Sequence, residues 1–152
     1  MFKAVGLGAI SGLRSIAAPA LLSRAVRRGD VGGLQGTPLA ALGFPKVSSV
    51  LQLMMIGEMV VDKMPFVPSR TSFLPLLGRT FSGALVGAAL FVSEGRRGNS
   101  GAVLGAFSAL AAAHAGERAR TTGTGEVPNA VIGVLEDTIV LALGPRLLQK
   151  RA

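Results

Sequence analysis

The feature that most constrains this chain is a series of five apolar stretches, each close to the length of a membrane-spanning helix. A helix needs about 20 mostly apolar residues to cross the hydrocarbon core of a bilayer. Such stretches cover approximately residues 2–23, 47–61, 73–93, 98–116 and 129–148. We therefore expect residues 1–152 to form a single integral membrane domain, an all-α polytopic helical bundle with about five transmembrane helices. Counts of four and six remain open.

Residues 31–45 form a further uncharged segment, but glycine and proline interrupt it. Two structures are compatible with this pattern, an interfacial loop and a broken or re-entrant half-helix. Non-helical backbone at membrane depth has to be shielded by protein or has to line a water-filled cavity. Re-entry would therefore require a packed interior, and the sequence leaves both alternatives open.

Composition excludes several classes of protein. Hydrophobic residues make up 49% of the chain and charged residues only 16%, whereas soluble proteins average about 25% charged residues. This argues against a disordered or nucleic-acid-binding tail despite a net charge of +8, and we expect no nucleic-acid partner. The absence of cysteine and the presence of one histidine argue against thiolate and multi-histidine metal sites.

No enzyme motif is present in the sequence. It contains no phosphate-binding P-loop, no Gly-x-Ser-x-Gly turn, no dinucleotide fingerprint and no His-Glu-x-x-His pair. We therefore expect neither an enzyme nor a bound cofactor.

The distribution of lysine and arginine predicts an orientation, because cytoplasmic loops carry an excess of these residues. With the N-terminus outside, five spans place nine basic residues on the cytoplasmic side and five on the other. The nine are Arg24, Arg27, Arg28, Lys46, Arg96, Arg97, Arg146, Lys150 and Arg151. We expect an inner-membrane protein with a cytoplasmic C-terminus, whose basic ends contact anionic lipid.

Glycines recur at a spacing of four residues in three of the apolar stretches. The pairs are Gly8 with Gly12, Gly83 with Gly87, and Gly101 with Gly105. In lipid, small residues at this spacing let helix backbones approach closely. The pattern predicts tight helix packing and says nothing about function.

Ionisable residues inside the apolar stretches are the candidates for function. Arginine, lysine or aspartate near the centre of a spanning helix costs roughly 2.5–3.5 kcal/mol on insertion scales. Such residues usually face a partner or a wet cavity. The candidate intramembrane polar site comprises Arg14, Glu58, Asp62, Lys63, Arg79, Glu136 and Asp137.

The two arginines of this set, Arg14 and Arg79, are expected to pair with its carboxylates. Glu58 and Asp62 are four residues apart and so share a helix face, although Asp62-Lys63 could simply end the second span at the interface. Glu136 and Asp137 interrupt the last span. They could form interhelical bonds or hold a cation or proton.

Several of these residues also belong to a wider pattern along the chain. In order, it comprises Gly8, Gly12, Arg14 and Ser15; Ala18-Pro19-Ala20; Glu58, Asp62, Lys63 and Pro65; Ser69-Arg70; Arg79, Gly83, Ala84, Leu85 and Gly87; and Glu136-Asp137. In this pattern the chain resembles, over nearly its whole length, the bacterial membrane family described as domain of unknown function 4126. The resemblance implies a small multi-span membrane protein with these charged positions as its hallmark, and it brings no agreed activity.

Two functions remain in competition. The first is a transporter or channel for a cation, a proton or a small solute, with the charged residues lining a polar cavity. The second is a structural or accessory membrane protein whose buried charges are interhelical ion-pair locks. A chain of this length has few helices with which to enclose a cavity, so a homo-oligomer is compatible with either function.

Overall fold

The described part of the chain is entirely helical. The computed structural model describes residues 1–61, 72–122 and 129–149, and no strand occurs among them. The elements are α1 (Phe2–Leu13), α2 (Ala17–Arg28), the 3₁₀ helix η1 (Pro38–Gly43), α3 (Pro45–Val61), α4 (Phe73–Ser93), α5 (Gly98–Thr122) and α6 (Asn129–Leu148). The prediction of an all-α fold is confirmed for these residues.

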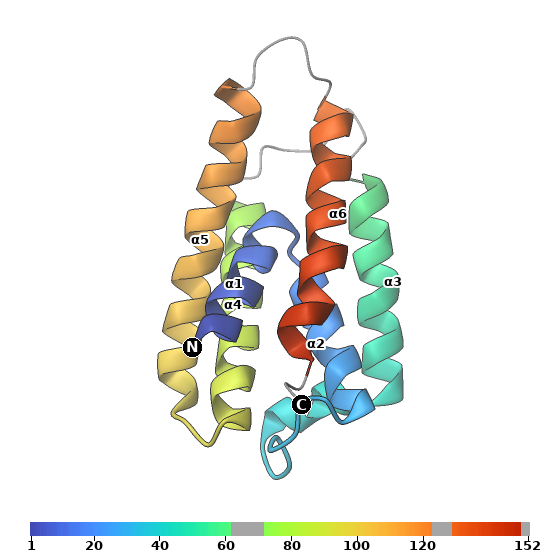
Figure 1. The fold of residues 1–152 in the computed structure, drawn as a ribbon, viewed down its shortest axis with the longest axis vertical. Helices are drawn as coiled ribbons and strands as arrows, with labels where there is room; N and C mark the ends of the chain where they lie inside the picture. The colour runs from blue at the N-terminus through green and yellow to red at the C-terminus, as the bar shows by residue number, and fades with distance from the viewer. Residues whose placement is uncertain (62–71, 123–128, 150–152) are drawn as a thin grey trace.

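The four long helices, α3 to α6, run roughly along the longest axis of the bundle (Figure 1). The bounds of α4 and α6 coincide with the predicted spans. Helix α5 continues six residues beyond the predicted end at residue 116, into a polar turn that includes Glu117 and Arg118. The apolar stretches therefore predicted four of the helices closely.

The first predicted span, residues 2–23, is not one helix. Helix α1 ends where Arg14 adopts an extended backbone conformation (φ −140°, ψ 114°), and α2 begins three residues later at Ala17. The chain turns back at this point, so that α1 and α2 form a helical hairpin whose tip lies partway along the long helices (Figure 1). We call α1, Arg14–Ile16 and α2 the N-terminal hairpin.

Proline explains the position of the break. In a continuous helix, the backbone N–H of residue 19 would bond to the carbonyl of Ser15, but Pro19 has no N–H and its ring would clash with that carbonyl. In the structure Pro19 instead lies in the first turn of α2, where a missing N–H costs nothing.

The hairpin also changes the expected topology. Both of its ends lie at the same end of the bundle as the end of α6 (Figure 1), and the Lys3 side-chain amine donates to the carbonyl of Gln149 at 3.2 Å. The predicted five-span arrangement has the first apolar stretch as one continuous helix, which the hairpin does not fit. The reason is that the first apolar stretch enters the bundle and returns. The orientation itself stays a prediction.

Residues 31–45 form a loop, which is the first of the two alternatives predicted for this segment. They form turns and the short helix η1 at the end of the bundle that holds the termini (Figure 1). Leu34 and Leu42 are buried, and the hydroxyl of Ser23 in α2 donates to the carbonyl of Leu42 at 2.5 Å. The segment is therefore a packed loop.

Glycines let α1, α4 and α5 pack backbone to backbone, as their spacing predicted. A Cβ added at Gly8 would lie 2.7 Å from the carbonyl oxygen of Gly105 in α5. A Cβ at Gly83 or Gly87 in α4 would also overlap the backbone of α5. Gly105 thus lies where all three helices meet.

Large apolar side chains cover the outer faces of the long helices. The more exposed ones include Val50, Leu53 and Ile56 on α3; Phe73, Leu74 and Phe81 on α4; Val103 and Phe107 on α5; and Leu135, Ile139 and Leu143 on α6. We call these residues the apolar girdle. Among the described residues, α4 is the one helix that is both long enough and apolar enough to cross a membrane.

Substituting Gly105 by alanine should destabilise the protein. The new Cβ would overlap backbone atoms of α4, which cannot move away as a flexible side chain can. Overpacking of this kind costs about 1–3 kcal/mol of unfolding free energy. Equilibrium unfolding in detergent, followed by circular dichroism, measures the change.

Gly57→Ala is the matched control, because Gly57 is an exposed residue of α3 with nothing within 4 Å of an added Cβ. Alanine is the better helix former by up to about 1 kcal/mol, so this variant should be as stable as the parent or more stable. Equal stability changes in the two variants would contradict the packing described for Gly105.

Candidate functional site

The tip of the N-terminal hairpin is held by three other helices. Arg14 contacts α6, Ser15 and Ile16 contact α3, and Ser15 also contacts α4. We call the residues that make these contacts the tip cluster: Arg14, Ser15, Ile16, Glu58, Ser82 and Asp137. The cluster therefore joins the break in the first apolar stretch to the helices around it.

Arg14 is fully buried, with 0% of its side chain exposed. Its Nε lies 2.8 Å from Oδ1 of Asp137, and its Nη2 donates to the carbonyl of Gly133 at 3.3 Å. Asp137 and Gly133 lie one turn apart on α6. Arg14 thus binds a carboxylate and a backbone carbonyl of the same helix, which ties the hairpin tip to α6.

Glu58 of α3 caps the N-terminus of α2. Its Oε1 accepts from the backbone N–H of Ser15 at 2.6 Å, and its Oε2 accepts from the N–H of Ile16 at 2.9 Å. The first N–H groups of a helix lack intrahelical partners and carry a partial positive charge. Since the side chain of Ile16 cannot cap the helix, a carboxylate from a distant part of the chain does so.

Ser82 of α4 supplies the donor that Pro19 lacks. The hydroxyl of Ser82 donates to the carbonyl of Ser15, which a continuous helix would have paired with the N–H of residue 19. A turn further along α2, the side-chain amide of Gln52 in α3 donates to the carbonyl of Ala20 at 2.8 Å. Ser82 therefore satisfies the backbone at the break, and Gln52 adds a further contact from α3 to the body of α2.

The remaining predicted site residues divide into two groups. Arg79 and Glu136 are buried, with 3% and 7% exposed; Arg79 lies one turn before Ser82, and Glu136 directly precedes Asp137. Asp62 and Lys63 lie outside the described residues. The structure therefore brings Arg14, Glu58 and Asp137 to the hairpin tip and buries Arg79 and Glu136 on two of the helices that hold it.

Five ionisable side chains lie in this region: two arginines (Arg14 and Arg79) and three carboxylates (Glu58, Glu136 and Asp137). Burying a charged group in a medium of low dielectric constant is costly unless the group is paired. Arg14 and Asp137 form such a pair, with 2.8 Å between Nε and Oδ1. The region therefore combines a helix break with a group of ionisable side chains.

The candidate site predicted from the sequence did not include Ser15 or Ser82, although Ser15 belongs to the family pattern, and the role of Glu58 as a helix cap was not predicted. Serine in an apolar helix is not distinctive, since its hydroxyl can bond to the backbone of its own helix. The available signal was Pro19, which disfavours a continuous helix through Ser15. That the predicted residues form a functional site stays a prediction.

The ion pair between Arg14 and Asp137 gives a prediction for stability. Removing one partner of a buried pair leaves an uncompensated charge and costs about 3–5 kcal/mol, whereas removing both costs much less. We expect Arg14→Gln and Asp137→Asn each to lower the unfolding free energy by that amount. The double variant should be more stable than either single variant, as measured by chemical unfolding in detergent.

Glu94→Gln is the control for loss of a carboxylate, because Glu94 is exposed and its contacts to the N-terminal amine and to Arg96 are 3.9 and 3.4 Å long. Exposed ion pairs contribute little, so its stability should match that of the parent. If the unfolding free energy lost in the double variant of Arg14 and Asp137 equals the sum of the losses in the two single variants, the two side chains do not stabilise each other.

Comparison with known proteins gives one match. The family described as "Domain of unknown function (DUF4126)" matches residues 1–145. No curated protein and no solved structure matches the chain. The matched range includes the N-terminal hairpin and every residue of the tip cluster. The resemblance predicted from the charged and glycine positions is thereby confirmed, and the chain belongs to the DUF4126 family.

Proposed function

We propose that this protein is a multi-pass membrane protein of the bacterial inner membrane that passes a proton or a small cation through the region of the tip cluster. The observation that carries the proposal is a helix break inside the bundle, surrounded by buried ionisable residues. The membrane location, the orientation and the transported species each have separate support.

The distribution of polar and apolar side chains supports the membrane location. The apolar girdle faces outward on all four long helices, whereas Arg14, Arg79 and Glu136 are buried. A soluble protein of this size rarely exposes apolar patches larger than a few hundred Å². In a membrane, by contrast, ionisable side chains face the interior of the bundle.

The position of the termini supports an orientation with both ends in the cytoplasm. The first apolar stretch is folded as a hairpin, so the start of α1, the end of α2 and the end of α6 lie at one end of the bundle. Ten basic residues stand in or next to the elements at this end in the sequence: Lys3, Arg24, Arg27, Arg28, Lys46, Arg96, Arg97, Arg146, Lys150 and Arg151. The other four are Arg118 and Arg120, near the end of α5, and Lys63 and Arg70, which come between α3 and α4 in the sequence. This asymmetry is larger than in the five-span arrangement, and basic residues favour the cytoplasmic side.

The tip cluster supports transport because it has the character of a transporter site. Secondary transporters bind their substrates and coupling ions near the bilayer midplane, where discontinuous helices expose backbone groups and helix ends. Here the N-terminus of α2 faces Glu58, and the break lies between α1 and α2. Glu58, Glu136 and Asp137 lie in this region, and carboxylates inside a bundle are the groups that relay protons or bind cations, which favours these species over an anion.

The burial and ion pairing of Arg14 favour a second candidate function. Arg14 is fully buried and ion-paired, which suits a structural or accessory membrane protein whose charges lock its helices together. On this hypothesis, exchanging the charges (Arg14→Asp with Asp137→Arg) would restore the stability that each single exchange removes. The purified protein would show no flux.

Flux into proteoliposomes tests the proposal. We expect the parent protein to raise proton or potassium flux above that of protein-free vesicles, measured with a pH-sensitive or potassium-sensitive dye inside. The double variant Arg14→Gln with Asp137→Asn removes both charges without leaving one unpaired, so it should fold but lose at least tenfold in flux. Glu94→Gln, on the exposed loop between α4 and α5, should retain parental flux.

If vesicles that contain the parent protein show the same proton, sodium and potassium fluxes as protein-free vesicles, the proposal of transport is overturned. The structural lock is then favoured. Parental flux in the double variant would place the pathway away from Arg14 and Asp137.

A further inference from the structure

We infer that the C-terminal end of α2 binds the headgroup of an anionic phospholipid, with Arg24 and Arg28 holding its phosphate. This inference rests on the membrane location proposed above and does not depend on transport. The site lies at the end of the bundle that holds both termini, away from the tip cluster (Figure 1).

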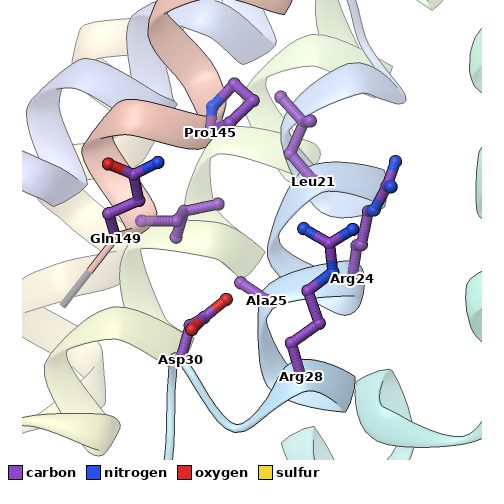
Figure 2. A pocket seen from close by; sticks show the side chains of 8 residues that line it. Leu21, Arg24, Ala25, Arg28, Asp30, Pro145 and Gln149 are labelled. Atoms are coloured by element: carbon purple, nitrogen blue, oxygen red, sulfur yellow. The ribbon is translucent and has the colours of Figure 1, made fainter.

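A cavity of about 210 Å³ lies between the end of α2 and the end of α6. Figure 2 shows the side chains of Arg24 and Arg28 on the α2 side, and Pro145 and Gln149 on the side of α6. The carboxylate of Asp30 lies at the α2 end of the same cavity. The volume is sufficient for a phosphate and a few further heavy atoms.

The arginines of this site have charge available for a ligand. Arg24 and Arg28 are four residues apart on α2 and therefore share a face. Within the described part of the chain, neither forms an ion pair with a carboxylate, Asp30 included. Arg28 lies in the last turn of α2, where the helix dipole favours a positive charge. The guanidinium groups of Arg24 and Arg28 can therefore bind phosphate oxygens in bidentate geometry.

A second cavity, of about 380 Å³, lies on the other side of α2, where it meets the start of α3. Arg24 and Arg28 line this cavity too, together with Arg27, Ser48 and Gln52. The row of arginines therefore lies between two hollows of the surface. An exposed arginine that only determines topology needs no such hollow, and Arg97 at the same end lines neither cavity.

The apolar part of the first cavity favours a lipid over free phosphate. Leu21, Leu148 and Pro145 line it beside the arginines, and Leu143 of the apolar girdle lies two residues before Pro145 on α6. A phosphate attached to a glycerol backbone and acyl chains would meet arginines at one end and this apolar surface at the other. The carboxylate of Asp30 in the same cavity can accept hydrogen bonds from headgroup hydroxyls, and phosphatidylglycerol is an anionic phospholipid that offers them.

Thermal unfolding of the purified full chain in neutral detergent tests the site. Phosphatidylglycerol should raise the unfolding temperature, whereas phosphatidylcholine and inorganic phosphate at the same concentration should not. Arg24→Gln with Arg28→Gln should lose most of this rise. Both residues are exposed, so without lipid the double variant should unfold at the parental temperature.

Lys46→Gln with Arg97→Gln is the control, because it removes the same charge from exposed residues that line neither cavity. It should retain the full rise with phosphatidylglycerol. An equal loss in both double variants would show diffuse attraction in place of a site, and a rise with inorganic phosphate would show an anion site without lipid. Either result overturns the inference. Membrane fractionation of the expressed parent tests the membrane location separately, so that the two failures can be told apart.

Discussion

The structure depends on satisfying the backbone at the tip of the N-terminal hairpin. Where the helix breaks, backbone N–H and carbonyl groups at the end of α1 and the start of α2 lose their helical partners. Glu58 accepts from the N–H groups of Ser15 and Ile16, and Ser82 donates to the carbonyl of Ser15. An unsatisfied polar group in an apolar medium costs several kcal/mol. The positions of α3 and α4 relative to the hairpin are therefore fixed by the need to supply these partners.

Space for the hairpin comes from glycine. A hairpin that enters a bundle and returns has to share the interior with the long helices, and it can do so only if some of them approach backbone to backbone. Gly8 of α1 and Gly83 of α4 both pack against Gly105 of α5. The glycines and the tip cluster thus have complementary roles, since the glycines bring the helices close and the polar contacts set the depth of the tip. The ion pair of Arg14 with Asp137 adds α6 to the same arrangement.

Much of this fold could be predicted from the sequence, because the length of an apolar stretch and the spacing of glycines are local properties. The bounds of α4 and α6 and the close packing of three helices followed from them. The break in the first stretch was missed, since a count of apolar residues cannot tell a spanning helix from two half-length helices that turn back. Pro19 was the local signal for it. The partners of Glu58 could not be predicted, because they are backbone groups that become available only once the helix has broken.

The central claim is that the first apolar stretch enters the bundle and returns on the same side. The chain has no cysteine, so single cysteines can be introduced at Lys3, Arg27, Arg118 and Gln149 and labelled with a membrane-impermeant maleimide in intact cells and in inverted vesicles. We expect the cysteines at positions 3, 27 and 149 to react from the cytoplasmic side, and the one at position 118 from the opposite side. Labelling of position 3 from the side opposite to position 27 would show that the first stretch spans the membrane, and would contradict the hairpin.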